Sequence, residues 1–163
     1  LDGGLPRWLA EGRPIEHGEP APAEPGAFTP DFRAELLRDS DAVLQATEGG
    51  AQIVDARAAV RFRGEAPEPR AGLRSGHIPG SRNLPWGELL ADGALIPPAE
   101  IAERFEAAGV DLSVPIITTC GSGVSAAILT LALTTLGRWD VPIYDGSWAE
   151  WGGDPRLPVA TGR

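Results

Sequence analysis

Short apolar runs that alternate with helical patterns are the feature that most limits how this chain can fold. Each run is short and apolar, as buried strands are. The three clearest runs are residues 51–57 (AQIVDAR), 114–119 (VPIITT) and 141–146 (VPIYDG). Strands that are separated by helices pair in parallel and need cover on both faces. The sequence therefore predicts an α/β protein with a central, mostly parallel sheet and helices on both faces.

Helical patterns and loops fill the sequence between these runs. The clearest helix is predicted at residues 97–110, with Pro98 near its first turn. Ile101 and Phe105 fall on one face of this helix, as an amphipathic pattern requires. The other predicted elements are a strand or helix start at 32–38, a helix at 39–50, a helical turn at 58–64, a loop at 65–81, a brief strand and turn at 83–90 and a mostly apolar helix at 124–137.

The only cysteine of the chain, Cys120, stands between a predicted strand and a predicted helix. In parallel α/β sheets ligands bind beyond the carboxyl ends of the strands, which is where Cys120 falls. Gly121 and Gly123 allow left-handed conformations that turn several backbone N–H groups inward. These groups and the positive end of the following helix predict a Cys120 pKa below the reference of about 8.5. Cys120 is therefore a candidate nucleophile. The alternative, a small buried cysteine at a strand end, would not need two glycines beside it.

Two other uses of a glycine-containing loop after a strand are disfavoured by the residues present. A nucleotide-binding loop would show Gly-Lys-Ser/Thr or Gly-x-Gly-x-x-Gly, and the chain has neither. A tyrosine-phosphatase-like enzyme also places a cysteine loop between strand and helix, but it closes the loop with an arginine six positions after the cysteine. Position 126 is Ala, so the bidentate grip on phosphate that such chemistry uses is missing.

Composition excludes several classes of partner. The net charge of −9 argues against nucleic acid, since phosphate binding needs a basic surface. No apolar run approaches the roughly 20 residues of a membrane span, so no membrane partner is expected. A single cysteine cannot form an internal disulfide, so nothing points to an oxidising compartment, and a cytoplasmic location is expected. All 14 positively charged side chains are arginines, so arginines must hold any anionic substrate.

The first residues of the chain repeat a pattern that is found near its end. LDGGLPRW (1–8) and YDGSWAEW (144–151) share an Asp-Gly pair with a tryptophan at the same spacing from the aspartate. The distance between the two copies is the size of a domain. We therefore predict that residues 1–16 are the C-terminal tail of a preceding homologous domain, 17–30 a proline-rich linker and 31–163 the catalytic domain. A chance likeness of two turn-rich stretches is the alternative.

Three motifs in this order resemble the rhodanese superfamily. CGSGVSA (120–126) is similar to the active-site loop of its 3-mercaptopyruvate sulfurtransferase type, which typically reads Cys-Gly-Ser/Thr-Gly-Val-Thr/Ser. Thiosulfate-preferring members instead carry a basic pair after the cysteine. Residues 54–85 look like the family's second-domain substrate segment, and DGSWAEWG (145–152) looks like its C-terminal signature. LDGGLPRW resembles the same signature closing the first domain, so the likeness covers nearly the whole chain.

The resemblance implies a rhodanese-like fold and a sulfur-transfer reaction with no metal or other cofactor. In such enzymes the cysteine thiolate takes the sulfur of 3-mercaptopyruvate, pyruvate leaves, and the cysteine carries a persulfide. A thiol such as thioredoxin, or cyanide in vitro, then accepts the outer sulfur. The implied partners are a small anionic sulfur donor, a thiol acceptor and the first rhodanese domain of the same protein. A thiosulfate sulfurtransferase and a non-enzymatic persulfide carrier are the alternatives.

The resemblance also implies which residues form the site. The catalytic residues are Cys120 and Ser122, and the substrate-binding residues are Arg61, Arg70, Gly121, Gly123, Val124 and Ser125. Planar guanidinium groups suit the carboxylate and keto oxygens of the donor. The histidine and aspartate that such enzymes couple to the loop serine belong to the first domain. His77 is expected to hydrogen-bond locally, and structural or packing roles are expected for Asp55, Arg63, Arg74, Trp148 and Trp151.

Overall fold

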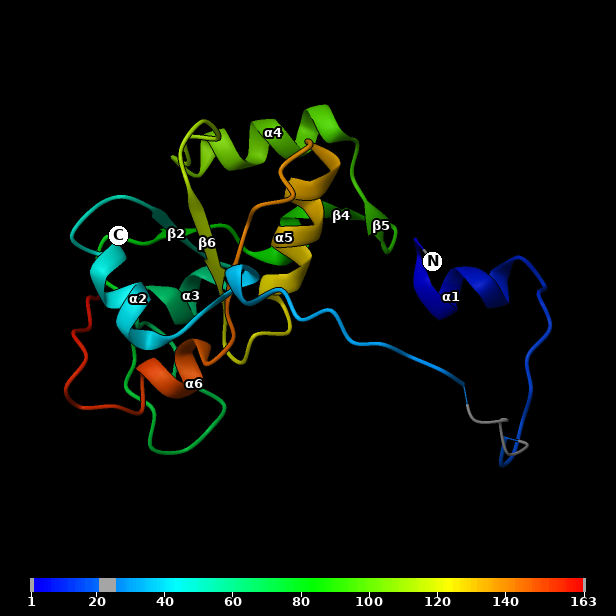
Figure 1. Cartoon of the computed structure of the whole chain (residues 1–163), viewed down its shortest axis with the longest axis horizontal. Helices are drawn as coiled ribbons and strands as arrows, with labels where there is room; N and C mark the ends of the chain where they lie inside the picture. The colour runs from blue at the N-terminus through cyan, green and yellow to red at the C-terminus, as the bar shows by residue number, and fades with distance from the viewer. Residues whose placement is uncertain (1, 21–25, 163) are drawn as a thin grey trace.

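The computed structural model describes residues 2–20 and 26–162, and within these ranges it contains six α-helices and two sheets (Figure 1). The helices are α1 (Gly4–Ala10), α2 (Ser40–Ala46), α3 (Ala59–Phe62), α4 (Pro98–Ala107), α5 (Ala126–Thr135) and α6 (Ser147–Trp151), with 3-10 turns η1 (Ala34–Leu36) and η2 (Trp86–Leu89). The strands are β1 (Leu37–Arg38), β2 (Gln52–Asp55), β3 (Arg82–Asn83), β4 (Leu90–Ala91), β5 (Ala94–Leu95), β6 (Ile116–Thr119) and β7 (Ile143–Tyr144). None of the helices in the described ranges has the length and apolar character needed to cross a membrane.

Five of the strands form one sheet in the order β1-β7-β6-β2-β3, and every neighbouring pair is parallel. In the central pair, Ile53 of β2 lies opposite Ile117 of β6, and Asp55 lies opposite Thr119. β4 and β5 form a separate antiparallel hairpin. The predicted α/β class with a central parallel sheet is therefore confirmed, and the carboxyl ends of β2, β6 and β7 meet at one edge, where polar residues follow each strand.

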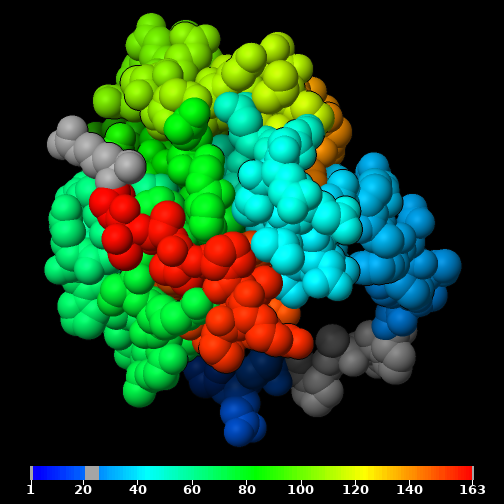
Figure 2. Space-filling view, turned by 90° about the vertical axis from the view of Figure 1, so that its left-hand side faces the viewer, coloured from blue at the N-terminus to red at the C-terminus, as the bar shows by residue number. Residues whose placement is uncertain are grey.

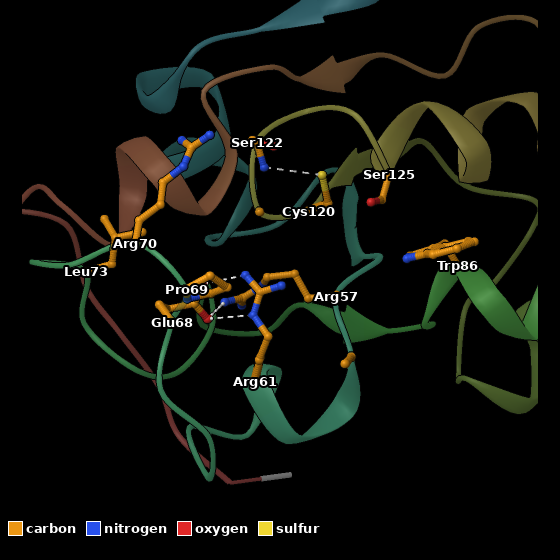
Figure 3. A pocket seen from close by; sticks show the side chains of 12 residues that line it. Arg57, Arg61, Glu68, Pro69, Arg70, Leu73, Trp86, Cys120, Ser122 and Ser125 are labelled. Atoms are coloured by element: carbon orange, nitrogen blue, oxygen red, sulfur yellow. Dashed lines mark hydrogen bonds and ion pairs between the residues drawn. The ribbon is translucent and has the colours of Figure 1, made fainter.

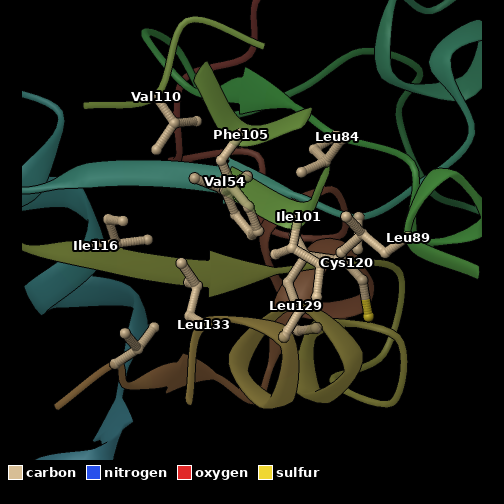
Figure 4. Close-up of a cluster of buried hydrophobic side chains, with 14 of the residues drawn as sticks. Val54, Leu84, Leu89, Ile101, Phe105, Val110, Ile116, Cys120, Leu129 and Leu133 are labelled. Atoms are coloured by element: carbon tan, nitrogen blue, oxygen red, sulfur yellow. The ribbon is translucent and has the colours of Figure 1, made fainter. Parts of the chain in front are cut away.

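Helices cover both faces of the sheet. Successive side chains of a strand point to opposite faces, so apolar strands present an apolar surface on each side that the helices bury. On one face, Val54 and Ile116 pack against α4 and α5 (Figure 4). On the other face, Ile53 and Ile117 pack against α2 and α6. The buried helix residues in these two clusters are Val43, Ile101, Phe105, Leu129, Leu133, Trp148 and Trp151. Each large side chain buried in this way contributes roughly 1.5–3 kcal/mol to folding, which makes the sheet a rigid base for the loops at its edge.

The ends of several elements differ from the sequence prediction. The helix predicted at 39–50 starts after the N-cap Asp39, whose side chain accepts the Ala42 N–H at 2.9 Å, and it ends at Ala46. The apolar helix predicted from residue 124 starts at Ala126, so Val124 and Ser125 belong to the loop before it. The β4–β5 hairpin and α6 were not predicted. Both are short elements that tertiary contacts stabilise, and propensity alone gives them little support.

The two ends of the chain lie in different surroundings. α1 stands apart from the sheet, and none of its residues is buried (Figure 1). The Leu95 N–H donates to Asp2 Oδ1 at 3.2 Å, which ties this end to the β4–β5 hairpin. The C-terminal segment instead lies across residues 60–80 (Figure 2), where His77 and Ala160 exchange two backbone hydrogen bonds of 2.8 and 3.0 Å. The domain limits near residues 16 and 30 stay predictions.

Candidate active site

Cys120 is the first residue after β6, at the carboxyl end of the strand in the middle of the sheet. All four residues of β6 are buried, and Cys120 itself is only 2% exposed. Its side chain lies at the edge of the core cluster formed with α4 and α5 (Figure 4). The strand therefore fixes the position of the sulfur, as the sequence predicted from the apolar run that precedes the cysteine.

A cavity of about 290 Å³ lies over the Cys120 loop (Figure 3). Its lining residues are Arg57, Ala58, Arg61, Glu68, Pro69, Arg70, Leu73, Trp86, Cys120, Gly121, Ser122 and Ser125. Six of the eight residues that the sequence assigned to the site are in this set. The other two are not: Gly123 is buried behind the loop, and Val124 is 75% exposed outside the lining. The structure thus brings the cysteine and both candidate arginines to one cavity, and their roles in catalysis stay predictions.

Close approach of other groups explains both glycines of the loop. Gly123 has φ +81°, and a Cβ at this position would lie 2.7 Å from Asp145 Oδ1. At Gly121, a Cβ would lie 3.2 Å from the Nη2 atom of Arg61. Between them the Ser122 N–H points at Cys120 Sγ, at 3.5 Å. The glycines therefore let the chain turn tightly around the sulfur and let Arg61 come close to the loop at Gly121.

Ser147, at the start of α6, joins the two ends of the Cys120 loop. Its hydroxyl oxygen accepts the Cys120 N–H at 3.2 Å and the Gly123 N–H at 3.0 Å. The same hydroxyl donates to the Tyr144 carbonyl at 2.8 Å and lies 4.0 Å from Cys120 Sγ. Ser147 is fully buried and has φ +50°, a backbone conformation that is uncommon for a residue with a side chain. This residue was missing from the predicted site, although it contacts the loop more extensively than any predicted residue outside the loop.

The sequence contained one signal that points to Ser147. In the repeated pattern, Ser147 occupies the position that Gly4 occupies in the N-terminal copy. Gly4 has φ +56°, close to the +50° of Ser147. φ is thus positive at this position in both copies, a value that suits glycine better. A serine at a position that favours glycine indicates that the hydroxyl has a function of its own.

Tyr144 is the last residue of β7, and its carbonyl accepts the hydrogen bond from the Ser147 hydroxyl. Burial raises the pKa of Tyr144 well above its usual range, and the Glu150 carboxylate, which accepts its hydroxyl at 2.7 Å, raises it further. The hydroxyl therefore stays protonated at all ordinary pH values and keeps its bond to Glu150. This contact fixes the strand end whose carbonyl accepts the Ser147 hydroxyl.

The two candidate substrate-binding arginines reach the cavity from different elements (Figure 3). Arg61 lies on α3, and its side chain is 27% exposed. Arg70 lies in the loop after α3, is exposed, and makes no hydrogen bond or ion pair with the described part of the chain. Arg61 is held by a buried carboxylate, whereas Arg70 is free to rotate toward a ligand. Both guanidinium groups can bind an anion next to Cys120.

A third arginine, Arg57, lies behind them and is held from four sides. Asp55 accepts from its Nε at 2.9 Å and from its Nη2 at 2.7 Å, and the Gly76 carbonyl accepts from Nη2 at 2.8 Å. Glu68 accepts from Nη1 at 3.0 Å, and the guanidinium lies 4.3 Å from the centre of the Trp148 ring. The structural role predicted for Asp55 corresponds to this contact. Arg57 and Glu68 were not predicted as cavity residues, although Arg57 stands at the carboxyl end of a predicted buried strand; the sequence around Glu68 does not distinguish it from a surface charge.

The remaining residues for which structural roles were predicted lie away from the sulfur. His77 Nδ1 lies 2.8 Å from the Phe62 carbonyl, and its ring stacks on Phe62 at 3.9 Å. Arg63 pairs with Glu65 at the surface. The indole N–H groups of Trp148 and Trp151 donate to backbone carbonyls. Arg74 donates to the carbonyls of Trp151, Gly152, Asp154 and Leu157.

Within residues 2–20 and 26–162, no three His, Cys, Asp or Glu side chains are grouped so that they could hold a metal ion.

Fold and site together define an α/β domain that presents one buried cysteine, in a glycine-containing loop, to an arginine-lined cavity. This chain belongs to the rhodanese-like domain family, whose model matches residues 39–154.

Two relatives and one solved structure show how close the similarity is. A 3-mercaptopyruvate sulfurtransferase of Escherichia coli K12 is 46% identical over 160 residues, which are 98% of this chain and 57% of the relative. A thiosulfate sulfurtransferase of Bos taurus is 46% identical over 154 residues, which are 93% of this chain and 52% of the relative. A crystal structure of a 3-mercaptopyruvate sulfotransferase from Escherichia coli aligns with a TM-score of 0.79 and 43% identity, covering 91% of this chain and 55% of that one. The chain thus spans a little over half the length of these relatives.

Proposed function

We propose that this chain carries the catalytic cysteine of a sulfurtransferase that takes sulfur from 3-mercaptopyruvate. The observation that carries the proposal is the position of Cys120, at the end of β6 and at the edge of a cavity lined by Arg61 and Arg70. The similarity to 3-mercaptopyruvate sulfurtransferases supports the donor. In the first half-reaction the Cys120 thiolate attacks the donor sulfur, the carbon–sulfur bond breaks, and pyruvate leaves after its enolate takes up a proton.

The second half-reaction returns the cysteine to its thiolate form. A thiol acceptor, such as thioredoxin or a small thiol, attacks the outer sulfur of the persulfide, and cyanide serves in the same way in vitro. The Ser122 N–H, which already points at Cys120 Sγ, supplies a hydrogen bond to the thiolate that is released. Arg61 and Arg70 would bind the donor's carboxylate and keto oxygen.

A preceding rhodanese domain is the proposed partner within the same protein. Two observations support it: the chain spans a little over half the length of its relatives, and α1 has no buried residue against the sheet domain. That domain would supply the histidine and the aspartate that the enzymes this chain resembles couple to the loop serine, which is Ser122 here. We further propose a cytoplasmic location, which rests on the sequence alone.

A thiosulfate sulfurtransferase is the second candidate. It is favoured by the bovine thiosulfate sulfurtransferase, which is as similar in sequence as the mercaptopyruvate enzyme. The Gly121-Ser122 pair speaks against it, since thiosulfate-preferring members carry a basic pair there. A persulfide carrier without catalytic turnover would hold the same persulfide on Cys120, but it would receive the sulfur from the persulfide of a partner protein and would therefore release no pyruvate.

Intact-mass measurement tests the proposal directly. The full-length protein is incubated with 3-mercaptopyruvate and, separately, with thiosulfate. We expect the mass of one sulfur atom to be gained from 3-mercaptopyruvate, pyruvate to be released in equal amount, and both to vanish in Cys120→Ser. A gain from neither donor would refute the sulfurtransferase proposal. A gain from thiosulfate alone would favour the second candidate.

A further inference from the structure

Glu68 is a buried carboxylate shared by two arginines of the cavity. Its side chain is only 1% exposed, although it lies in a loop between two prolines. Oε1 accepts from Arg57 Nη1 at 3.0 Å and from Arg61 Nε at 3.3 Å. Oε2 accepts from Arg61 Nη2 at 2.5 Å. Figure 3 shows dashed lines from this carboxylate to both guanidinium groups. A charged group that is so completely buried is costly unless its partners are fixed.

Arg57 is the fixed partner. Asp55, the Gly76 carbonyl and the Trp148 ring hold its guanidinium on its other sides, and its side chain is 1% exposed. Because Arg57 is held on its other sides, it fixes the position of the Glu68 carboxylate that it binds. Glu68 is therefore a rigid support at the base of the cavity.

Arg61 is the partly exposed partner that this support orients. Glu68 holds the Nε and Nη2 edge of its guanidinium, which leaves the Nη1 hydrogens and one Nη2 hydrogen for a ligand. The Nη2 atom lies only 3.2 Å from where a Cβ of Gly121 would be. Glu68 thus holds Arg61 so that its Nη2 and Nη1 atoms lie beside Gly121, the residue that follows Cys120.

The charges around the cavity leave a small surplus. The carboxylates of Asp55 and Glu68 offset the guanidiniums of Arg57 and Arg61, with which they pair. Among the charged lining residues that the structure describes, Arg70 is left as the one positive group without a paired carboxylate. This positive charge faces the Cys120 thiolate and the donor together, so a donor with one carboxylate, such as 3-mercaptopyruvate, suits it better than a dianion such as thiosulfate.

We propose that Glu68 is a positioning residue that orients Arg61 and, by offsetting its charge, sets the preference for a monoanionic over a dianionic sulfur donor. The inference rests on the proposed function, because it concerns the donor half of that reaction. It differs from a purely structural role in one respect. Removing the charge of Glu68 changes the relative rates of two donors, and not only their common rate.

Single-turnover persulfidation of Cys120 tests the inference, with each donor measured separately in the full-length protein by quenching and intact mass. This readout excludes any effect on the acceptor step. In Glu68→Gln the cavity gains one uncompensated positive charge, which attracts a dianion twice as strongly as a monoanion. We expect the ratio of the second-order rate constants, thiosulfate over 3-mercaptopyruvate, to rise about tenfold.

Two further variants separate charge from position. Glu68→Asp keeps the charge but shortens the side chain, so both rate constants should fall together and their ratio should stay within about twofold. Glu65→Gln makes the same change in net charge three positions away, in the surface pair with Arg63, and should leave the ratio unchanged. If Glu68→Gln does not fold, the Asp variant decides, because unchanged rates with both donors would contradict a positioning role.

The possible failures can be told apart. An unchanged ratio in a folded Glu68→Gln protein, with normal persulfidation of the wild type, would overturn the role of Glu68 and leave the proposed function standing. No persulfidation of the wild type by either donor would overturn the proposed function itself. A ratio that rises equally in Glu65→Gln would show a general charge effect and would overturn the specific role of Glu68.

Discussion

The hydroxyl of Ser147 lies 4.0 Å from the sulfur of Cys120, although the two residues are 27 positions apart in the chain. β7 and the start of α6 bring the serine to the carboxyl edge of the sheet, beside the end of β6. There it accepts the backbone N–H groups of Cys120 and Gly123, one at each end of the turn around the sulfur. The shape of the cysteine loop therefore depends on a residue outside it.

Replacing Ser147 with Ala is expected to loosen the loop. Two buried N–H groups would lose their acceptor, which costs about 1–3 kcal/mol for each group. We expect lower stability toward urea and persulfidation of Cys120 slowed by at least tenfold. Ser147→Gly loses the same hydrogen bonds but relieves the φ of +50°, so it should be more stable than Ala and equally slow. Wild-type rates in both variants would show that the hydroxyl has no part in shaping the site.

The fit of Gly123 can be tested against a second glycine with the same backbone conformation. Gly123→Ala would add a Cβ 2.7 Å from Asp145 Oδ1 at φ +81°. Gly137→Ala, at φ +84° after α5, meets nothing within 4 Å. The second variant should lose only the backbone preference, about 1–2 kcal/mol. We expect Gly123→Ala to lose more stability in urea unfolding and to slow persulfidation. Equal losses of stability with full activity in both would contradict the close approach.

Arg61 and Arg70 should contribute to donor binding. A lost hydrogen bond to a charged group typically costs about 1.5–3 kcal/mol, so Arg61→Ala and Arg70→Ala should each raise KM for 3-mercaptopyruvate by roughly 10- to 100-fold. Arg63→Ala is the matched control, since Arg63 pairs with Glu65 at the surface two positions from Arg61. Steady-state kinetics with a fixed acceptor would measure the three effects. Unchanged KM and kcat in the Arg61 and Arg70 variants would exclude the two arginines from the donor site.

Arg74 should stabilise the fold without taking part in the reaction. Its guanidinium donates to four backbone carbonyls at and after the end of α6, those of residues 151, 152, 154 and 157. A lysine cannot reach several carbonyls at once with a planar fork. We expect Arg74→Ala to lower the free energy of unfolding by about 2–4 kcal/mol and Arg74→Lys to recover only part of it. Arg156→Ala, which removes an exposed ion pair with Asp154, should have little effect in the same urea titration.

Features that depend on neighbouring residues in the chain were predictable. The apolar runs, the helix at 97–110 and the glycines around Cys120 each follow from local preference, because strands, helices and tight turns have periodicities and residue requirements of their own. These features gave the α/β class, the parallel sheet and the place of Cys120 at a strand end. The candidate arginines came from the motif in which they stand, since composition alone does not separate Arg61 from Arg63.

What only the tertiary structure decided is which distant groups surround the sulfur. Ser147 reaches Cys120 from another strand end, and the loop after α3 folds back so that the Glu68 carboxylate is shared by Arg57 and Arg61. A serine after Asp-Gly and a glutamate between two prolines look like surface residues in the sequence. Their burial depends on how the loops fold over the sheet edge, and only long-range packing fixes that arrangement. The sequence determined that a cysteine would stand at the edge of a parallel sheet, and the packing of loops over that edge decided its partners.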